Sequence, residues 1–376
     1  MNGPFPPEDP EPVRADRVSR GRRPLLSRRS FIGLILASGA ATVAAILRNV
    51  AGHRAPAPSP RSHVSFPRRP ATTTEPPPTP AESPSPATRK GSLLIHGTGD
   101  VNLDPDYVTT YRTRGYGYAW SGIGGLFERD DLAIVNCECP VSRRGTKYPG
   151  KQFIFRGDPA ALPAMKAAGV DVASMANNHS YDYGPEALLD TRRNMLSAGI
   201  APVGAGRDPD EATLPAMLHA KGWRVAVLGL DQVLDPDPEE KAGDGHPGTA
   251  GGHDFPAMVA AVRAAKAGAD LLAVIIHWGV ELDTHPRMQQ VTQGHALIEA
   301  GADVIFGSHA HRLQPMEMYR GRPIFYSLGN FVWPNFSVAG STTAVAEVRV
   351  SPEGRFAARM LPAFIEAPGH PVLRGH

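Results

Sequence analysis

Two histidines one residue apart, His309 and His311, follow an apolar run in GADVIFGSHAHRLQP, residues 301–315. Imidazoles bind metals and transfer protons because their pKa lies near neutrality. In an extended segment, residues i and i+2 point the same way. We therefore expect both rings to aim at one point, with the small Gly307 and Ala310 leaving room for it.

This segment has two counterparts in the chain. The three stretches are AGVDVASMANNH (168–179), AGADLLAVIIHWG (267–279) and AGADVIFGSHAH (300–311). Each gives an Ala-Gly helix end, an Asp, an apolar strand and then a histidine, a pattern that favours strands covered on both faces. Sites in open α/β sheets form at the carboxyl ends of strands. The repeat therefore predicts that His179 and His277 join the His309–His311 pair at one edge.

Polar side chains follow other predicted strands. They include Asp100, Asn102, Asp104, Asn136, Glu138, Asn177, Asn178 and Asp182. A donor set of carboxylates, an amide and imidazoles fits a site for Mn, Fe or Zn better than it fits a zinc site of the thiolate type. Ligands from many strand ends favour two divalent ions, which at about 3.5–4 Å apart can clamp the attacking and leaving oxygens of a displacement. Asn178 either ligates through its amide oxygen or holds its loop. Cys137 and Cys139 are interpreted as small strand residues.

The elements that must position these side chains are predicted from residue 91 onward. Strands are expected at 92–97, 132–137, 170–175, 224–230, 271–278, 303–308, 323–328 and, antiparallel, 344–350, and helices at 159–169, 185–199, 255–268 and 287–301. Alternating strands and helices predict an α/β layered sheet.

The first ninety residues have a different composition. Arg28 and Arg29 precede an uncharged run from Phe31 to Leu47, which predicts an export signal or an anchor. The expected organisation is a basic cytoplasmic tail (1–26), a twin-arginine-like signal or signal anchor (27–50), a disordered Pro-rich linker (51–90), the folded domain (91–365) and a C-terminal tail (366–376). The positive-inside rule places the domain outside the cytoplasm, either tethered by an uncleaved segment or secreted after cleavage.

Charge is distributed unevenly along the chain. Residues 1–90 hold 14 Lys and Arg against 6 Asp and Glu. The whole chain has 39 basic and 37 acidic residues, so the remainder holds 25 basic and 31 acidic residues. A mildly acidic folded part argues against nucleic acid as a partner, since nucleic-acid-binding surfaces are basic.

Six motifs occur in an order that resembles a known family. They are Gly99-Asp100-Val101, Asn136-x-Glu138-x-Pro140, Asn177-Asn178-His179 with Asp182 and Gly184, His277-Trp278-Gly279-x-Glu281, Gly307-x-His309-x-His311 and Ser327-Leu328-Gly329-Asn330-Phe331. Over about residues 91–340 the chain resembles the CapA, or poly-γ-glutamate capsule synthesis, family, which is related to the calcineurin-like metallophosphoesterases. The resemblance implies an α/β fold, a four-layer α-β-β-α sandwich, with a metal site at the strand ends.

The resemblance also implies roles for individual residues. The implied metal ligands are Asp100, Glu138, Asn178, His277, His309 and His311, with His179 as general acid. Residues implied to bind substrate or support the ligands are Asn102, Arg156, Asp182, Glu281 and Asn330. Arg156 either binds a substrate carboxylate or phosphate or forms a surface salt bridge, and Glu281 is a candidate for orienting His277. Asn102 and Glu138 depart from the wider superfamily, which has His and Asp at these positions.

Two functions follow from this resemblance. The first is a metal-dependent hydrolase acting on a phosphoester or on an anionic polymer such as poly-γ-glutamate. The alternative is a non-catalytic component that binds the polymer during capsule export or anchoring. Expected partners are that polymer or phosphoester, the cell membrane and capsule-synthesis membrane proteins.

Overall fold

The computed structural model describes residues 64–65, 89–233, 240–252 and 254–375. The chain divides into two compact units, Met1–Ala57 and Pro58–His376, and every described residue lies in the second unit. The predicted tail and signal segment, and nearly all of the predicted linker, lie outside the described residues. No helix in the described part is long and apolar enough to cross a membrane.

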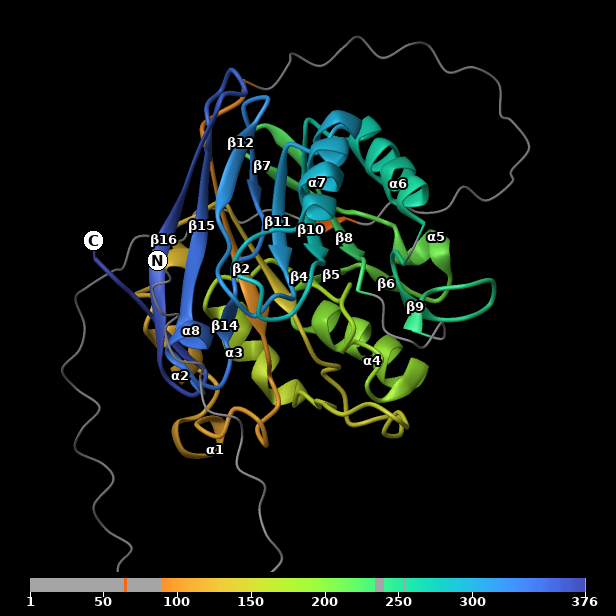
Figure 1. Cartoon of the computed structure of the whole chain (residues 1–376), viewed down its shortest axis with the longest axis vertical. Coiled ribbons are helices and arrows are strands. Elements are labelled where there is room, and N and C mark those ends of the chain that lie inside the picture. Colours follow the sequence, from red (N-terminus) through yellow and green to blue (C-terminus); the bar gives the residue numbers. More distant parts are fainter. Residues whose placement is uncertain (1–63, 66–88, 234–239, 253, 376) are drawn as a thin grey trace, which may run out of the picture. The chain divides into compact units, whose positions relative to one another are not determined.

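The first of two large sheets has seven strands (Figure 1). Its spatial order is β1 (Val64–Ser65), β7 (Ala216–Ala220), β8 (Trp223–Asp231), β10 (Leu271–His277), β11 (Val304–Ser308), β13 (Arg322–Phe325) and β12 (Met316–Tyr319). Strands β8, β10, β11 and β13 are parallel. Every residue of β10 is buried, which explains its uninterrupted apolar sequence up to the terminal His277.

The second sheet has eight strands. Its order is β17 (His370–Leu373), β16 (Phe356–Ala367), β15 (Thr342–Val350), β2 (Leu93–Val101), β3 (Leu132–Cys137), β4 (Val172–Ser174) and β5 (Ala201–Val203), with β14 (Asn330–Val332) also paired to β2. Strands β2 to β5 and β14 run parallel, whereas β15, β16 and β17 form an antiparallel extension.

The two sheets face each other, and helices cover their outer faces. Between the sheets, Ile95 of β2 and Ile275 of β10 belong to one buried apolar cluster with Phe306 of β11. A second cluster packs α6 (Phe255–Ala267) and α7 (Met288–Ala300) on the first sheet, and a third packs α3 (Leu162–Ala167) and α4 (Gly184–Ser197) on the second. The result is the predicted α-β-β-α layering. In such cores, truncating one large aromatic side chain to alanine typically lowers the free energy of unfolding by about 3–5 kcal/mol.

Local sequence sets the helix boundaries. Helix α6 begins after Asp254, whose side chain accepts a hydrogen bond from the amide of Ala257 at 3.0 Å, and Pro256 stands in its first turn. It ends at Gly268. Smaller elements are α1 (Tyr111–Arg114), α2 (Tyr118–Ser121), α5 (Pro209–Ala212), α8 (Val338–Ser341), the 3₁₀ turns η1 (Leu126–Glu128) and η2 (Pro159–Ala161), and the pair β6 (Ala205–Gly206) and β9 (Gly248–Thr249).

The eight predicted strands correspond to β2, β3, β4, β8, β10, β11, β13 and β15, and the four predicted helices to η2 with α3, α4, α6 and α7. The predicted C-terminal tail at 366–376 is corrected. Residues His370–Leu373 form β17, which pairs antiparallel with β16. Pro368 and Gly369 form the turn between them, with Gly369 at a φ of 70°. Two residues of the predicted linker also form a strand, because β1 pairs with β7.

Ion pairs within and between β15 and β16 stabilise the antiparallel extension. The buried Glu347 of β15 lies 2.9 Å from Nε of Arg359 on β16 and 3.0 Å from Nε of Arg349. Burial raises the pKa of Glu347, but its hydrogen bonds and ion pairs with the two arginines outweigh burial and lower that pKa to about 2.

Candidate metal centre

Side chains from the carboxyl ends of strands in both sheets meet in one buried cluster. Asp100 lies near the end of β2, and Glu138 directly follows β3. His277 ends β10, and His309 and His311 follow β11. Ligand atoms of Asp100, Glu138 and His311 all lie within 4.8 Å of one another. The parallel strands therefore bring polar groups from distant parts of the sequence to a single point.

Glu138 lies at the middle of this cluster. Its carboxylate is fully buried, and Oε1 lies 3.6 Å from Nε2 of His311, 3.8 Å from Nε2 of His277 and 4.0 Å from Nε2 of His179. Neither oxygen of Glu138 has a hydrogen-bond partner among the described residues. Because a buried carboxylate without a partner is costly, this arrangement fits a bound cation.

Asn178 and His309 complete the cluster. Nε2 of His277 lies 3.0 Å from Oδ1 of Asn178 and 3.1 Å from Nδ1 of His309. Nδ1 of His277 lies 2.8 Å from Oγ of Ser308. All six residues predicted as metal ligands are thus brought together by the fold, as a set of oxygen and nitrogen donors that suits a divalent transition metal.

The backbone route to this convergence differs from the predicted one. His309 and His311 do not lie in an extended segment, because their φ angles are 90° and 50°. Left-handed backbone is uncommon for residues with a side chain and concentrates at functional sites. The two rings converge because the chain turns sharply after β11, and their centroids lie 6.2 Å apart.

A close approach between β2 and the loop before β14 supports Asp100. The amide of Asp100 donates to the carbonyl oxygen of Gly329 at 3.0 Å, and Asn330 is paired with Asp100 across the two strands. A Cβ added to Gly99 would lie 1.8 Å from the Gly329 oxygen. Only glycine fits at position 99, because any side chain there would separate these strands.

His179 is oriented by a buried carboxylate. Its Nδ1 lies 2.8 Å from Oδ2 of Asp182, which also accepts a hydrogen bond from the amide of Phe155 at 2.8 Å. With Nδ1 engaged, Nε2 of His179 faces the cluster. The phenyl ring of Phe155 packs on the imidazole, with ring centroids 4.5 Å apart.

Lys151 and Glu240 belong to the site although sequence reasoning missed them. Nζ of Lys151 lies 3.0 Å from Oδ1 of Asp182 and 2.6 Å from Oε1 of Glu240. It also donates to the backbone carbonyl of Asn178. Lys151 therefore ties together three loops beside the cluster. A single lysine in a loop carries no sequence signal for this role, and its partners lie far away in the chain.

The other predicted site residues have separate placements. Asn330 holds His311, with Oδ1 2.8 Å from Nδ1 of the ring. Asn102 is buried, and its Oδ1 accepts a hydrogen bond from the amide of Asp104 at 2.9 Å. The guanidinium of Arg156 donates to two backbone carbonyls, those of Arg144 and Gly145, at 3.0 Å. It also lies 3.5 Å from the centre of the Tyr183 ring.

Burial shifts the pKa values of the cluster. Burial and the nearby His309 and His311 lower the pKa of His277 well below its usual range, and burial with the charge of His311 lowers the pKa of His309 to about 4. Burial and the charge of Asp100 raise the pKa of Glu138 well above its usual range. Burial alone would lower the pKa of His311, but its contacts with Asp100 raise it. The unliganded cluster therefore favours neutral imidazoles at His277 and His309.

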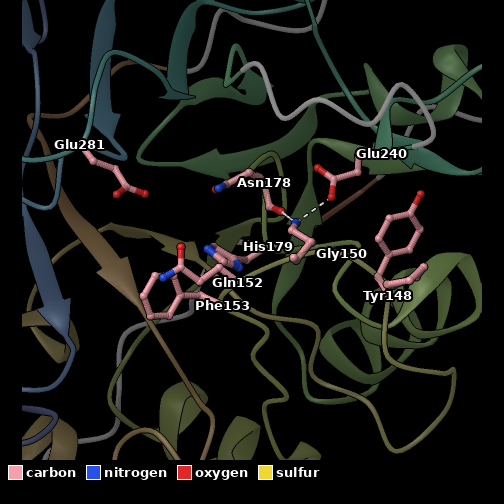
Figure 2. Close-up of a pocket in the computed structure, with 10 residues that line it drawn as sticks. Tyr148, Gly150, Gln152, Phe153, Asn178, His179, Glu240 and Glu281 are labelled. Carbon is pink, nitrogen blue, oxygen red and sulfur yellow. Dashed lines mark hydrogen bonds and ion pairs between the residues drawn. The ribbon is translucent and has the colours of Figure 1, made fainter. Parts of the chain in front are cut away.

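Three cavities open around the cluster. The first, of about 360 Å³, is lined by Asn178, His179 and Glu281 with the 148–153 loop (Figure 2). The second, of about 580 Å³, reaches Asn178, Glu281 and His309. The third, of about 220 Å³, reaches His179, Glu281 and His311 beside an aromatic wall. A substrate can therefore approach the cluster from solvent.

The cysteines lie outside the cluster. Cys137 and Cys139 are free and buried, and both belong to the apolar core beneath α3 and α4. This placement agrees with their interpretation as small strand residues. Sγ of Cys139 accepts a hydrogen bond from the amide of Leu103 at 3.3 Å.

A family model described as "Bacterial capsule synthesis protein PGA_cap" matches residues 95–335. The chain belongs to this family. The matched range begins in β2 and ends after β14, so it includes every predicted metal ligand.

Individual members of the capsule synthesis family show the same relationship. The chain is 30% identical over 256 residues to "PGA biosynthesis protein CapA" of Bacillus subtilis, covering 67% of each protein. It is 28% identical over 280 residues to "Capsule biosynthesis protein CapA" of Bacillus anthracis, covering 73% of this chain and 68% of that protein. It is 31% identical over 228 residues to "Probable polyglutamine synthesis accessory protein Rv0574c" of Mycobacterium tuberculosis, covering 58% of this chain and 60% of that protein.

Solved structures give weaker likenesses. The NAD nucleotidase of Haemophilus influenzae is 14% identical with a TM-score of 0.45, covering 77% of this chain and 54% of that one. The 5'-nucleotidase of Candida albicans is 12% identical with a TM-score of 0.41, covering 73% of this chain and 51% of that one.

Proposed function

We propose that this member of the capsule synthesis family is a divalent-metal-dependent hydrolase with a calcineurin-like phosphoesterase architecture. Its substrate would be an anionic polymer such as poly-γ-glutamate, or a phosphoester. The observation that carries the proposal is Glu138, a fully buried carboxylate with no hydrogen-bond partner in the described part of the chain and with three imidazoles around it.

The metal would be held by the residues already brought together. We propose two ions of Mn, Fe or Zn, held by Asp100, Glu138, Asn178, His277, His309 and His311. Such ions supply Lewis acidity and make water a better nucleophile at neutral pH. His179, fixed by Asp182 through Nδ1, presents Nε2 toward the leaving group as a general acid.

The substrate class follows from the family. The names of the Bacillus relatives refer to PGA biosynthesis and capsule biosynthesis. A capsule polymer is met outside the cytoplasm, which agrees with the twin-arginine-like segment at 27–50. We therefore propose an extracytoplasmic protein, tethered or secreted, that works beside capsule-synthesis proteins in the membrane.

Elemental analysis of the purified protein tests this proposal first. We expect stoichiometric Mn, Fe or Zn in the wild type, and its loss in a His309→Ala/His311→Ala double variant. His219→Ala, which removes an exposed histidine on β7, is the matched control and should keep the metal. Thermal unfolding without added metal checks that the variants fold.

Hydrolysis assays on the same samples then separate the two functions. Metal-dependent cleavage of poly-γ-glutamate or of p-nitrophenyl phosphate, lost in the double variant, supports the hydrolase. A wild type that holds no metal even after reconstitution refutes the hydrolase and leaves the polymer-binding function.

A further inference from the structure

Glu281 lines all three cavities that surround the candidate metal centre. In Figure 2 its carboxylate points toward the side chain of Asn178, and His179 lies below Asn178 in this view. Its side chain is exposed, and it forms no ion pair or hydrogen bond with any described residue. It is therefore a carboxylate held where a substrate must pass, without a structural partner.

The other charged side chains lining these cavities have partners. Lys151 pairs with Asp182 and Glu240. Arg287 pairs with Asp283 at 2.7 Å. The guanidinium of Arg312 donates to the carbonyl of His311 at 2.9 Å. Among the described carboxylates and basic side chains that line these cavities, Glu281 is thus the one without an ion pair or hydrogen bond of its own.

The loop that carries Glu281 is fixed in place. The amide of Leu282 donates to the carbonyl of Ala310 at 2.8 Å, which attaches the loop to the segment between His309 and His311. Leu282 adopts a φ of 68°, a conformation that is uncommon for a residue with a branched side chain. A strained backbone held by its surroundings is typical of a functional position. The loop therefore fixes where the Glu281 carboxylate lies relative to the cluster.

We propose that Glu281 is the catalytic acid–base group when this site hydrolyses an amide, and that the substrate class is a peptide-like amide, such as a γ-linked glutamyl amide. With this substrate Glu281 takes over the proton transfer, and His179 donates a hydrogen bond to the charge that develops on the substrate oxygen. This inference rests on the proposed hydrolase function and names its substrate. A carboxylate at this position can accept a hydrogen bond from an amide N–H, a donor that a phosphoester lacks. Metal-site glutamates that are not ligands serve as general bases in other hydrolases.

The proton balance of the step is simple. Glu281 accepts a proton from the attacking water as the water oxygen bonds to the carbonyl carbon. It then returns that proton to the amide nitrogen as the C–N bond breaks. The products are a carboxylic acid and an amine, so no other reactant is needed. An amine leaves poorly without a proton, whereas p-nitrophenolate leaves readily without one.

Leaving-group dependence therefore tests the role in the metal-loaded full chain. The substrates are a γ-glutamyl oligomer, assayed by newly formed amino groups, and a γ-glutamyl p-nitrophenyl ester. We expect Glu281→Gln to slow amide cleavage by roughly 10²–10⁴-fold and ester cleavage by a factor at least tenfold smaller, with unchanged metal content. Asp283→Asn, which removes a carboxylate from the same loop, should leave both rates unchanged.

The possible failures are distinguishable. Equal losses on amide and ester, or no loss on either, overturn the acid–base role of Glu281. A wild type that cleaves p-nitrophenyl phosphate but no γ-glutamyl amide overturns the substrate class while the hydrolase proposal stands. A wild type that holds metal but cleaves none of the three compounds refutes both.

Discussion

Replacing Glu138 with glutamine should separate metal binding from folding. Burial holds the pKa of Glu138 well above its usual range, which favours the neutral form of this side chain in the metal-free protein. Glutamine has the same shape and is also neutral. We therefore expect Glu138→Gln to change the free energy of unfolding of the metal-free protein by no more than about 1 kcal/mol.

The metal-loaded protein should behave differently. A ligand present at a thousandfold excess over its dissociation constant stabilises the native state by about 4 kcal/mol. At roughly 2 °C per kcal/mol for a large domain, that is a rise of about 8 °C in the unfolding midpoint of the wild type. Because Glu138 lies at 3.6–4.0 Å from three imidazole nitrogens, its loss should remove most of this rise.

Differential scanning calorimetry with and without added Mn or Zn measures both quantities. Gln293→Ala, which changes a buried polar side chain lining the second cavity, is a control for general damage. A full metal-induced rise in the Glu138→Gln variant would show that the cluster is not the metal site. A loss of more than about 3 kcal/mol in the metal-free variant would show that Glu138 is ionised and paired there.

Three further outcomes follow from the structure. Gly99→Ala should lower the free energy of unfolding, measured in urea, by about 1–3 kcal/mol or more, because its Cβ would lie 1.8 Å from the oxygen of Gly329. Gly117→Ala is the control and should be nearly neutral, because open space surrounds that position. The pKa of about 2 for Glu347 lies below the usual carboxyl value of about 4.3, so its stabilisation is present above that value and is lost as pH falls toward 2. Glu347→Gln should therefore flatten the decline in stability between pH 5 and pH 3. The raised pKa of Glu138 means that binding metal releases a proton, so affinity should increase with pH, and titration calorimetry in two buffers should count the proton.

The sequence predicted the elements that carry strong local patterns. The run LLAVIIHW predicted β10 because every residue of that strand is buried. The repeated Ala-Gly-x-Asp layout correctly placed His179, His277 and His309 after strand ends, but not on one sheet edge, because His179 follows β4 of the second sheet whereas the other two follow β10 and β11 of the first. These predictions succeeded because a strand end is set by local sequence, and the parallel topology then fixes where the end lies.

Other features depend on contacts that local sequence does not encode. The pairing of Lys151 with Glu240 joins loops 89 residues apart. The turns at His309 and His311 lie at positions without glycine, the residue that most often marks left-handed backbone. Strand β17 was mistaken for a tail because HPVL is short and contains a proline, although the preceding Pro-Gly pair is a turn signal.

The pairing of β14 with β2 has a consequence for the order in which this protein matures. Asp100 and Asn330, which flank His311, come from opposite ends of the family domain and meet only across this pairing. Contacts between such distant residues form late, because a long loop must close before they are made. A ribosome-bound chain that has not yet released Asn330 cannot hold His311 in place. The centre therefore gains the support of its last ligand, His311, only after nearly the whole family domain has been synthesised, so metal acquisition should report completed folding.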